Sequence, residues 1–301
     1  MIHPLILFLL ALVLLYVGGE ILVNGAVSIS KKLNISTLVI GLTIVSFATS
    51  APELFVCLKA AISGNSDIVF GNIIGSNIAN LALVLGITAV IFRVKISVQT
   101  IGVNFPFLFF STLVFSFFLY FLNGLSHLIG FLLILFLMSF ITYLIKTSEN
   151  EKIENLEKEN DRSIFWNILY IISGVFLLKY GADWLIDGTI YIAKFFNVSD
   201  RVIAVTAVAI GTSIPELVTS IIAALRKEEN LAVGNLIGSN IFNLLAVLGI
   251  TSLFVDLQVN DNQILKFDIP FMLFTTSILG LMIYRSTKYV ITRKEGLILL
   301  F

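Results

Sequence analysis

The sequence carries little charge and very few histidine or cysteine residues. Charged residues make up 13% of its 301 residues, about half of the share found in an ordinary soluble domain. The formal net charge is zero, which gives no support for a nucleic-acid or acidic partner. The single cysteine, Cys57, lies in an apolar run, so a framework of disulfide bonds is excluded. The two histidines, His3 and His127, fall near expected helix ends, and no serine–histidine or cysteine–histidine arrangement indicates an enzyme.

What the sequence does contain is long apolar runs, with 58% hydrophobic residues overall. About 20 apolar residues are needed for a helix to cross a bilayer, so the chain is predicted to be an all-α polytopic membrane protein. The start MIHPLILFLL lacks the basic segment of a signal peptide, which indicates a retained first helix. The expected helices cover residues 4–31, 37–62, 68–92, 101–122, 125–146, 164–194, 200–225, 231–255 and 267–284.

A tenth apolar run starts at Gly296, and the printed sequence ends five residues later at Phe301. GLILLF is too short to cross a bilayer. We therefore expect a ten-helix fold whose last helix is truncated in this sequence.

The basic residues predict the orientation of the chain. If the N-terminus is outside, only Lys59, Lys194, Arg201 and Lys266 fall in outer loops. Lys179 lies within a helix, and all other lysines and arginines fall on the inner side. Because inner loops of membrane proteins are enriched in basic residues, we expect a multi-pass protein of the cell membrane with its N-terminus outside. The charged connector, residues 147–163, would then be a solvated cytoplasmic linker.

The sequence contains an internal repeat with a constant offset of 163 residues. YVGGEILVNG at 16–25 resembles KYGADWLIDG at 179–188, and GNIIGSNIANLALVLGI at 71–87 resembles GNLIGSNIFNLLAVLGI at 234–250. The predicted organisation is a first five-helix repeat at 1–146, the linker at 147–163 and a second repeat at 164–301. Since five is odd, the second repeat enters the membrane from the opposite side, an inverted arrangement that is typical of transporters.

Each repeat places a proline and a glutamate in the middle of a membrane-length apolar run. In SFATSAPEL (46–54), Thr49, Ser50 and Glu53 share one helix face. Pro52 cannot donate a hydrogen bond to the Ala48 carbonyl, which is therefore freed. Hydroxyls, freed carbonyls and a carboxylate are the ligands that hard cations such as Ca²⁺ and Na⁺ prefer. The second repeat supplies the same set in AIGTSIPEL, with Gly211, Thr212, Ser213, Pro215 and Glu216.

The third helix of each repeat adds polar side chains at helical spacing. Ser76 and Asn80 lie one turn apart, and Asn72 extends the same stripe. Nearby glycines are expected to let another backbone approach closely. The second copy supplies Asn235, Ser239 and Asn243, whereas Asn77 and Asn240 lie beside the stripe and are expected to be farther from an ion.

Charge balance limits the cargo of such a site. Two bare carboxylates at the membrane midplane are costly, and one Ca²⁺, two Na⁺ or two protons would neutralise them. Competition between these loads would by itself produce exchange. The alternative, that Glu53 and Glu216 are protonated packing residues, is disfavoured by the duplicated context. Glu20 and Asp183 occupy equivalent positions, and with Lys179 four residues before Asp183 we expect an ion pair or an interfacial contact there, with no role in transport.

ATSAPEL and GTSIPEL, each followed by GNxxGSN, resemble the two α-repeats of the Na⁺/Ca²⁺ exchanger branch of the cation/calcium exchanger superfamily. The resemblance implies a ten-helix fold and alternating access, with the first and sixth helices sliding against a core of eight. It also implies that the transported ions are Ca²⁺ and Na⁺, with no cofactor. The short connector has no room for a regulatory domain, which suggests a minimal, prokaryote-like exchanger.

The resemblance assigns a metal site to twelve positions of this sequence. Glu53 and Glu216 would be the central carboxylates, with backbone carbonyls of Thr49 and Thr212. Flanking Na⁺ sites would use Ser50, Ser76, Ser213 and Ser239, with carbonyls of Ser46 and Ala209, and Asn80 and Asn243 would lie at the centre. Three departures from the family pattern matter. Ala48 replaces a usual glycine, and the tenth helix is incomplete. Some members carry an aspartate at the position of Asn243, whereas both central positions are asparagine here, so the number and identity of the coupling ions stay open.

Two rival functions remain at this point. One is proton-coupled Ca²⁺ exchange, because the two glutamates can take protons. The other, from a different class, is a cation channel. Beyond the lipid bilayer and these ions, the sequence indicates no nucleic acid and no obligate protein partner.

Overall fold

The computed structural model describes residues 4–148, 163–195, 211–285 and 289–301. Most helices match the apolar runs to within a few residues, and the chain has the all-helical fold of a membrane protein. The helices are α1 Pro4–Leu33, α2 Thr37–Ile40, α3 Ser46–Thr49, α4 Ala51–Ile62, α5 Ser66–Ala79, α6 Leu85–Ile91, α7 Phe105–Leu122, α8 His127–Ser148, α9 Ile164–Phe195, α11 Ile214–Leu225, α12 Glu229–Phe242, α13 Leu248–Phe254, α14 Ile269–Arg285 and α15 Arg293–Leu300.

Seven helices in the described residues are long and apolar enough to cross a membrane, and the pair Thr37–Thr49 and Ala51–Ile62 forms an eighth span with a bend of 43°. Ile214–Leu225 is a shorter apolar helix. The predicted run 200–225 begins outside the described residues. The last run, expected from Gly296, is the end of the eight-residue helix α15, which already begins at Arg293.

Several spans contain a π-helical turn, which the sequence analysis did not predict. These turns lie at Gly41–Val45, Asn80–Val84, Thr100–Asn104, Asn243–Val247 and Ile264–Asp268. Four of them form two pairs of repeat equivalents. Because π-turns widen a helix locally and often occur at functional sites, their duplication indicates that each repeat needs the same local irregularity.

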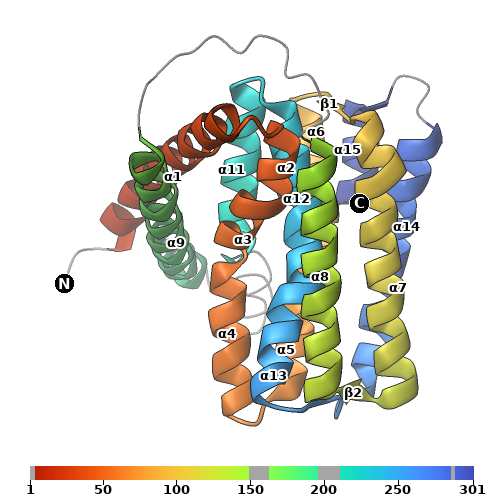
Figure 1. Ribbon diagram of the computed structural model, residues 1–301. Helices are drawn as coiled ribbons and strands as arrows, with labels where there is room; N and C mark the ends of the chain where they lie inside the picture. Colours follow the sequence, from red (N-terminus) through yellow and green to blue (C-terminus); the bar gives the residue numbers. More distant parts are fainter. Residues whose placement is uncertain (1–3, 149–162, 196–210, 286–288) are drawn as a thin grey trace.

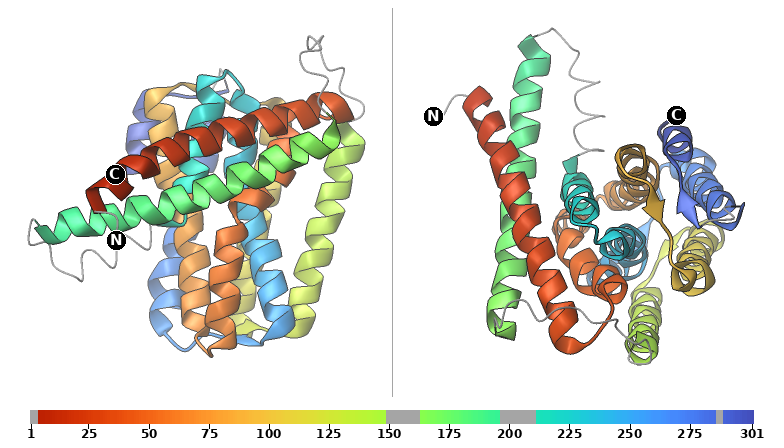
Figure 2. Two further views of the ribbon diagram at one scale, coloured as in Figure 1. Left: turned by 90° about the vertical axis from the view of Figure 1, so that its left-hand side faces the viewer. Right: turned by 90° about the horizontal axis from the view of Figure 1, so that it is seen from above.

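Helices α1 and α9 lie side by side, strongly tilted, on one side of an upright bundle formed by the other helices (Figures 1 and 2). Glycines allow this close contact. A Cβ on Gly18 would lie 2.9 Å from the Leu178 backbone nitrogen, and a Cβ on the equivalent Gly181 would lie 2.9 Å from Leu15. Small residues at such crossings are typical of packed membrane helices.

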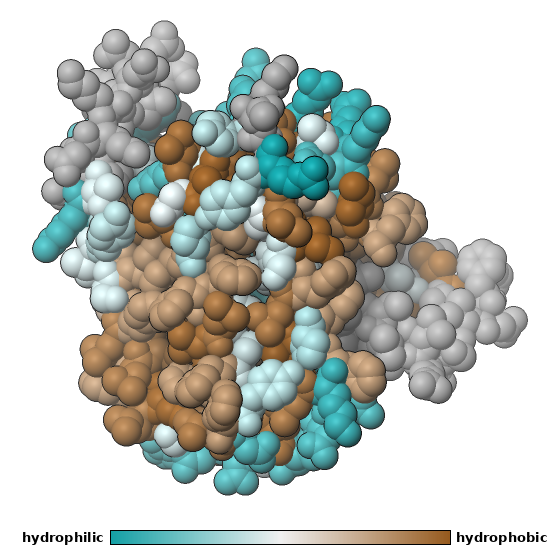
Figure 3. Space-filling view, turned by 90° about the vertical axis from the view of Figure 1, so that its right-hand side faces the viewer, coloured by the Kyte–Doolittle hydropathy of each residue, from teal (hydrophilic) through white to brown (hydrophobic). Residues whose placement is uncertain are grey.

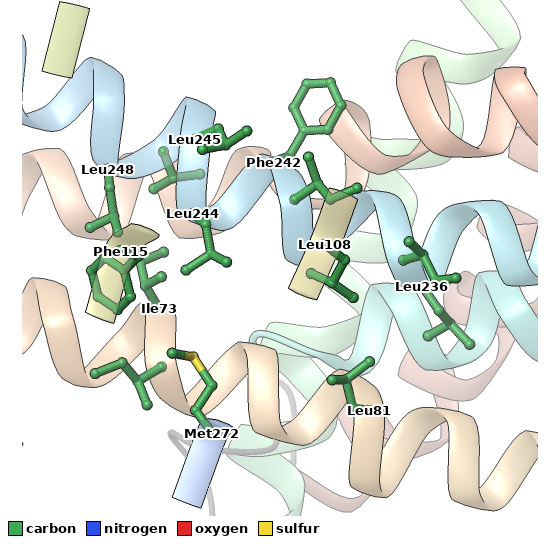
Figure 4. Close-up of a cluster of buried hydrophobic side chains, with 14 of the residues drawn as sticks. Ile73, Leu81, Leu108, Phe115, Leu236, Phe242, Leu244, Leu245, Leu248 and Met272 are labelled. Atoms are coloured by element: carbon green, nitrogen blue, oxygen red, sulfur yellow. The ribbon is translucent and has the colours of Figure 1, made fainter. Parts of the chain in front are cut away.

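The centre of the bundle is the span that contains α12 and α13. Of its most apolar window, 89% is buried, the highest share of any candidate span in the described chain. Leu244 and Leu248 of this span lie beside Ile73 and Phe115 from α5 and α7, and Leu236 lies farther along the same cluster, on the side of Leu108 (Figure 4). The outside of the molecule shows an apolar band between two hydrophilic ends, as expected for a bilayer-embedded protein (Figure 3).

Two short antiparallel ladders join the repeats at opposite ends of the bundle. β1 (Val94–Lys95) pairs with β4 (Val290–Ile291), and β2 (Gly124–Leu125) pairs with β3 (Leu257–Gln258). Each ladder connects the loop after the third helix of one repeat with the loop after the fourth helix of the other. The apolar runs predict only helices, because strands of two residues are too short to show an alternation of apolar and polar residues.

A second cross-repeat contact is also symmetric. The Tyr284 hydroxyl donates to the Ile101 carbonyl at 3.0 Å, and the Tyr120 hydroxyl donates to the Leu265 carbonyl. Both carbonyls belong to the π-turns of the fourth helices. Each repeat therefore uses a tyrosine to satisfy a main-chain carbonyl of the other repeat, and carbonyls that face lipid need such partners.

Candidate cation site at the paired helix breaks

Both Pro–Glu motifs begin a helix in the same way. Ser50 separates α3 from α4 with φ −83° and ψ 1°, and Ser213 precedes α11 with φ −91° and ψ 0°. Pro52 and Pro215 occupy the first turn of the helix that follows. There, the missing N–H of proline costs nothing, because first-turn N–H groups have no partner within the helix. Each sequence therefore encodes a break that exposes polar main-chain groups inside the molecule.

The two glutamates follow directly after the breaks and are buried. Glu53 is 1% exposed and Glu216 is 0% exposed, each in the first turn of its helix. The positive end of a helix dipole favours a carboxylate at this position. Glu53 Oε2 and both carboxylate oxygens of Glu216 have no hydrogen-bond partner among the described residues. Buried charged oxygens without partners are rare in proteins, so these oxygens are available to a ligand.

The two carboxylates, one from each repeat, lie close to each other. Thr212 lies beside the Glu53 carboxyl group, Thr49 lies beside that of Glu216, and Glu53 is near enough for its charge to act on Glu216. The predicted meeting of the two motifs is therefore present in the structure. Two negative charges in one buried site repel each other unless a cation or protons compensate them.

Hydroxyl groups from the third helices complete the surroundings. Thr49 Oγ1 lies 3.2 Å from Ser239 Oγ and donates to Asn235 Oδ1 at 3.2 Å. In the symmetric position, Thr212 Oγ1 lies 3.2 Å from Ser76 Oγ. Each break is thus held against α5 or α12 of the opposite repeat, as the inverted repeat predicted.

A close backbone approach positions the first break. A Cβ on Gly238 would lie 2.2 Å from Ser46 Oγ and 2.8 Å from the Leu42 carbonyl oxygen. The Ser46 hydroxyl donates to the Gly41 carbonyl at 2.6 Å and contacts the Asn235 carbonyl at 3.0 Å. The predicted role of glycine on α12 is therefore confirmed. The equivalent contacts of α5 would involve Ala209 and its neighbours, which lie outside the described residues.

Four asparagines gather at the centre, which is more than the sequence analysis assigned. Asn80 and Asn243 each begin a π-turn, and their Oδ1 atoms are buried without a hydrogen-bond partner in the described chain. Asn243 Nδ2 donates to Asn77 Oδ1 at 3.0 Å, and Asn77 Nδ2 donates to the Asn240 carbonyl at 3.4 Å. Asn77 therefore orients Asn243, and the Asn240 carbonyl in turn holds Asn77. Asn77 and Asn240 are separated by the repeat offset of 163, and this duplication was the sequence signal that could have identified them.

The site is an oxygen-rich set without a transition-metal cluster. Ser50 Oγ and Ser213 Oγ are buried and have no hydrogen-bond partner in the described part of the chain. Within the same residues, no group of three histidine, cysteine, aspartate or glutamate side chains could hold a metal. Carboxylate, hydroxyl, amide and main-chain oxygens suit Ca²⁺ and Na⁺ better than softer metals.

Helix α9 covers both breaks. Val175 and Leu178 of α9 line a small apolar pocket together with Thr49, Pro52 and Pro215. A larger apolar crevice of about 340 Å³ lies beside it, between α9 and the α2–α4 span, and is lined by residues such as Ile44, Phe47 and Ile172. The site is thus separated from the outside on this face by apolar side chains of α9.

Charged residues away from the site pair with one another. Lys179 donates to Asp183 at 2.6 Å, which confirms the predicted ion pair within α9. The equivalent Glu20 pairs instead with Arg226, a contact that the sequence analysis missed because the repeat has Ser63 at the position equivalent to Arg226. His127 hydrogen bonds to Asp256 and holds the pKa of Asp256 below its ordinary value.

Comparison with known proteins agrees with this geometry. A family model described as sodium/calcium exchanger protein matches residues 3–146 and 166–301. The chain belongs to this family. It is therefore a transporter and not an enzyme, and the resemblance found in the motifs is confirmed.

Relatives within the family cover almost the whole chain. The putative antiporter CaxA of Alkalimonas amylolytica is 39% identical, over 98% of this chain and 94% of the relative. The sodium/calcium exchanger MaX1 of Methanosarcina acetivorans is 32% identical, over 98% and 95%. A solved structure of the sodium–calcium exchanger NCX_Mj, soaked with Na⁺ and Sr²⁺, has a TM-score of 0.83 and 31% identity, covering 99% of this chain and 95% of that one.

Proposed function

We propose that this exchanger-family chain is a secondary antiporter that moves Ca²⁺ out of the cell in exchange for Na⁺. The observation that carries the proposal is the meeting of Glu53 and Glu216, one from each inverted repeat, in a buried site with partnerless carboxylate oxygens. One Ca²⁺ balances both charges, and two Na⁺ do the same. Because the two loads need the same oxygens, binding of one displaces the other.

The ligand set combines buried atoms that lack partners with the positions that the family motifs assign. The carboxylates with main-chain carbonyls of Thr49 and Thr212 would hold Ca²⁺, and Asn80 and Asn243 would lie beside it. Flanking Na⁺ ions would use hydroxyls of Ser50, Ser76, Ser213 and Ser239 and carbonyls of Ser46 and Ala209. Support comes from the buried, unpaired oxygens of Ser50, Ser213, Asn80 and Asn243.

Alternating access would be a movement of the α1/α9 pair against the other helices. The two ladders and the two tyrosine contacts tie the bundle together across the repeats. By contrast, α9 meets the breaks through apolar side chains beside an apolar crevice. A smooth apolar contact has no directional bonds to break during sliding.

The proposed orientation has the N-terminus outside and the 147–163 linker in the cytoplasm, in the cell membrane. The excess of basic residues on one side supports it. An Escherichia coli relative that is 31% identical over 93% of this chain is named an inner membrane protein.

Proton-coupled Ca²⁺ exchange is a second candidate, favoured by one observation. Both central side chains, Asn80 and Asn243, are neutral amides, so two protons on the glutamates would discharge the site completely. A cation channel is disfavoured, because the site is covered by α9 and a channel requires a continuous pore.

Uptake of radioactive Ca²⁺ into proteoliposomes tests the proposal. Vesicles loaded with Na⁺ and diluted into Na⁺-free medium should accumulate Ca²⁺, and vesicles with only a pH gradient should not. Uptake driven by the pH gradient alone would replace Na⁺ with H⁺ as the coupling ion. Uncoupled flux far above about 10³ ions per second would indicate a channel, since typical turnover of a protein-limited cycle lies below that rate.

A further inference from the structure

One polar contact fastens the α1/α9 pair to the end of α11. Arg226, directly after α11, donates from Nε to Glu20 Oε1 at 3.1 Å and from Nη2 to the second carboxylate oxygen. Its third nitrogen, Nη1, donates to Asn24 Oδ1, one helical turn farther along α1. A guanidinium that binds both carboxylate oxygens fixes orientation as well as distance.

Apolar packing on the same side is also close. A Cβ on Gly19 would lie 3.1 Å from Val218 Cγ1 of α11, and Ile222 of α11 is only 3% exposed. The repeat-equivalent contact would join α9 at Ala182 to α4 at Phe55. In the described chain, α9 makes no comparable contact with α4, and Phe55 is 69% exposed.

The asymmetry defines which state the structure represents. In an inverted repeat, exchanging the roles of the two halves generates a second arrangement, in which α9 packs on α4 and α1 leaves α11. The α1/α9 pair here lies against the half of the molecule that contains the α11–α12 turn. With the proposed orientation, this is the cytoplasmic half, so the site would be closed toward the cytoplasm.

The arginine exists on one side only. The residue equivalent to Arg226 is Ser63, and the residues equivalent to Glu20 and Asn24 are Asp183 and Asp187. Asp183 is already paired with Lys179 within α9. The cation nearest in sequence to Ser63 is Lys59, whose single ammonium cannot reproduce the planar guanidinium contact.

We propose that Arg226 is a positioning residue that holds α1 against α11 and thereby favours the state closed on the side of the α11–α12 turn. The inference rests on the proposed alternating-access function. Glu228 also lies near Arg226 and near Lys31, but the described hydrogen bonds of the Arg226 guanidinium go to Glu20 and Asn24. Loss of Arg226 should therefore shift the balance of states without touching an ion ligand.

State-specific disulfide formation tests this. In the full-length chain with Cys57→Ser, one variant carries Gly19→Cys and Val218→Cys, which reports the state described here. The other carries Ala182→Cys and Phe55→Cys, the repeat-equivalent pair. Both are oxidised in proteoliposomes with and without Arg226→Ser, so that any disturbance caused by the cysteines is common to each comparison.

Arg226→Ser should lower the initial rate of 19–218 cross-linking relative to 182–55 cross-linking by roughly two- to fivefold, the range expected for a partly exposed ion pair. Exchanging the charges with Glu20→Arg and Arg226→Glu should restore the ratio, and Arg226→Lys should restore it in part. Lys227→Gln removes a neighbouring positive charge outside the pair and should leave the ratio unchanged.

An unchanged ratio in Arg226→Ser would overturn the inference, as would an equal shift in Lys227→Gln. A variant that merely misfolds would lose both cross-links together and would not be rescued by the charge exchange. The readout does not depend on the ion carried. A chain that cross-links as expected but shows no Na⁺-driven Ca²⁺ uptake would therefore contradict the proposed function and leave this inference standing.

Discussion

The chemistry of this protein depends on a few buried oxygens whose partners are missing within the protein. Glu53 and Glu216 could be assigned from sequence because proline and glutamate are costly in a membrane helix and both occur twice in the same context. The roles of Asn77 and Asn240, by contrast, could not be assigned from the sequence. Helical spacing places them three residues before Asn80 and Asn243 in regular helix, but it does not predict the hydrogen bond that joins Asn77 to Asn243 of the other repeat.

Glu53→Gln and Glu216→Gln should each reduce Na⁺-driven Ca²⁺ uptake by at least about 100-fold. Each change removes one of two charges that would balance Ca²⁺, and losing a buried charged partner costs about 3 kcal/mol or more. Uptake of radioactive Ca²⁺ measures the effect, and Glu229→Gln, which lies outside the site and pairs with Lys95, serves as the control. Substantial uptake by both site variants would contradict the assignment.

Asn243→Asp should change the dependence of Ca²⁺ uptake on Na⁺ concentration. The new carboxylate lies next to Asn77, whose Oδ1 now accepts from the Asn243 amide, and the added charge would require one more positive charge in the bound load. The measurement is the Hill coefficient for Na⁺, which should rise. The same Na⁺ dependence in the variant would show that this position does not set the coupling.

At the scale of whole elements, the apolar runs predicted the spans well, and their interruptions less well. The breaks at Pro52 and Pro215 were predicted from the missing N–H. The π-turns at Thr100–Asn104 and Ile264–Asp268 were not, because no residue type marks them. Tyr120 and Tyr284, the tyrosines that donate to carbonyls of these turns, occupy equivalent positions in the two repeats. A single tyrosine in an apolar run nevertheless indicates only a lipid-facing residue.

The contact between α12 and the first break should be intolerant of any added carbon. Gly238→Ala places a Cβ 2.8 Å from the Leu42 carbonyl and even closer to Ser46, and overpacking of this kind costs about 1–3 kcal/mol. We expect a lower midpoint of thermal unfolding in detergent. Gly102→Ala, whose Cβ would meet nothing within 4 Å, is the matched control, and equal effects of the two changes would contradict the packing argument.

For the molecule as a whole, the inverted repeat is the feature that sequence predicts most firmly, since one offset of 163 aligns the first three helices of both halves. What it cannot reveal is how the halves differ in a given state. The contact of Arg226 with Glu20 and the open position of Phe55 arise because α1 and α9 sit against one half. The repeat in the sequence is the same in both states, whereas the structure shows the packing of α1 and α9 in one of them.

The two ladders provide a test of orientation. Lys95 of β1 and Gln258 of β3 are exposed at opposite ends of the bundle (Figure 1). In the Cys57→Ser background, a membrane-impermeant maleimide applied to intact cells should label Gln258→Cys and leave Lys95→Cys unlabelled until the cells are opened. The reverse pattern would invert the proposed topology.

The ladders and the tyrosine contacts share one further property. Every one of them joins a position in one half to a different position in the other half, and occurs twice. Two separate five-helix chains with the same sequence, inserted in opposite directions, would form all of these contacts without modification. The architecture is therefore consistent with descent from an antiparallel homodimer whose gene was duplicated and fused. In that ancestor no residue could serve one face alone, so a one-sided residue such as Arg226 could arise only after fusion allowed the halves to diverge.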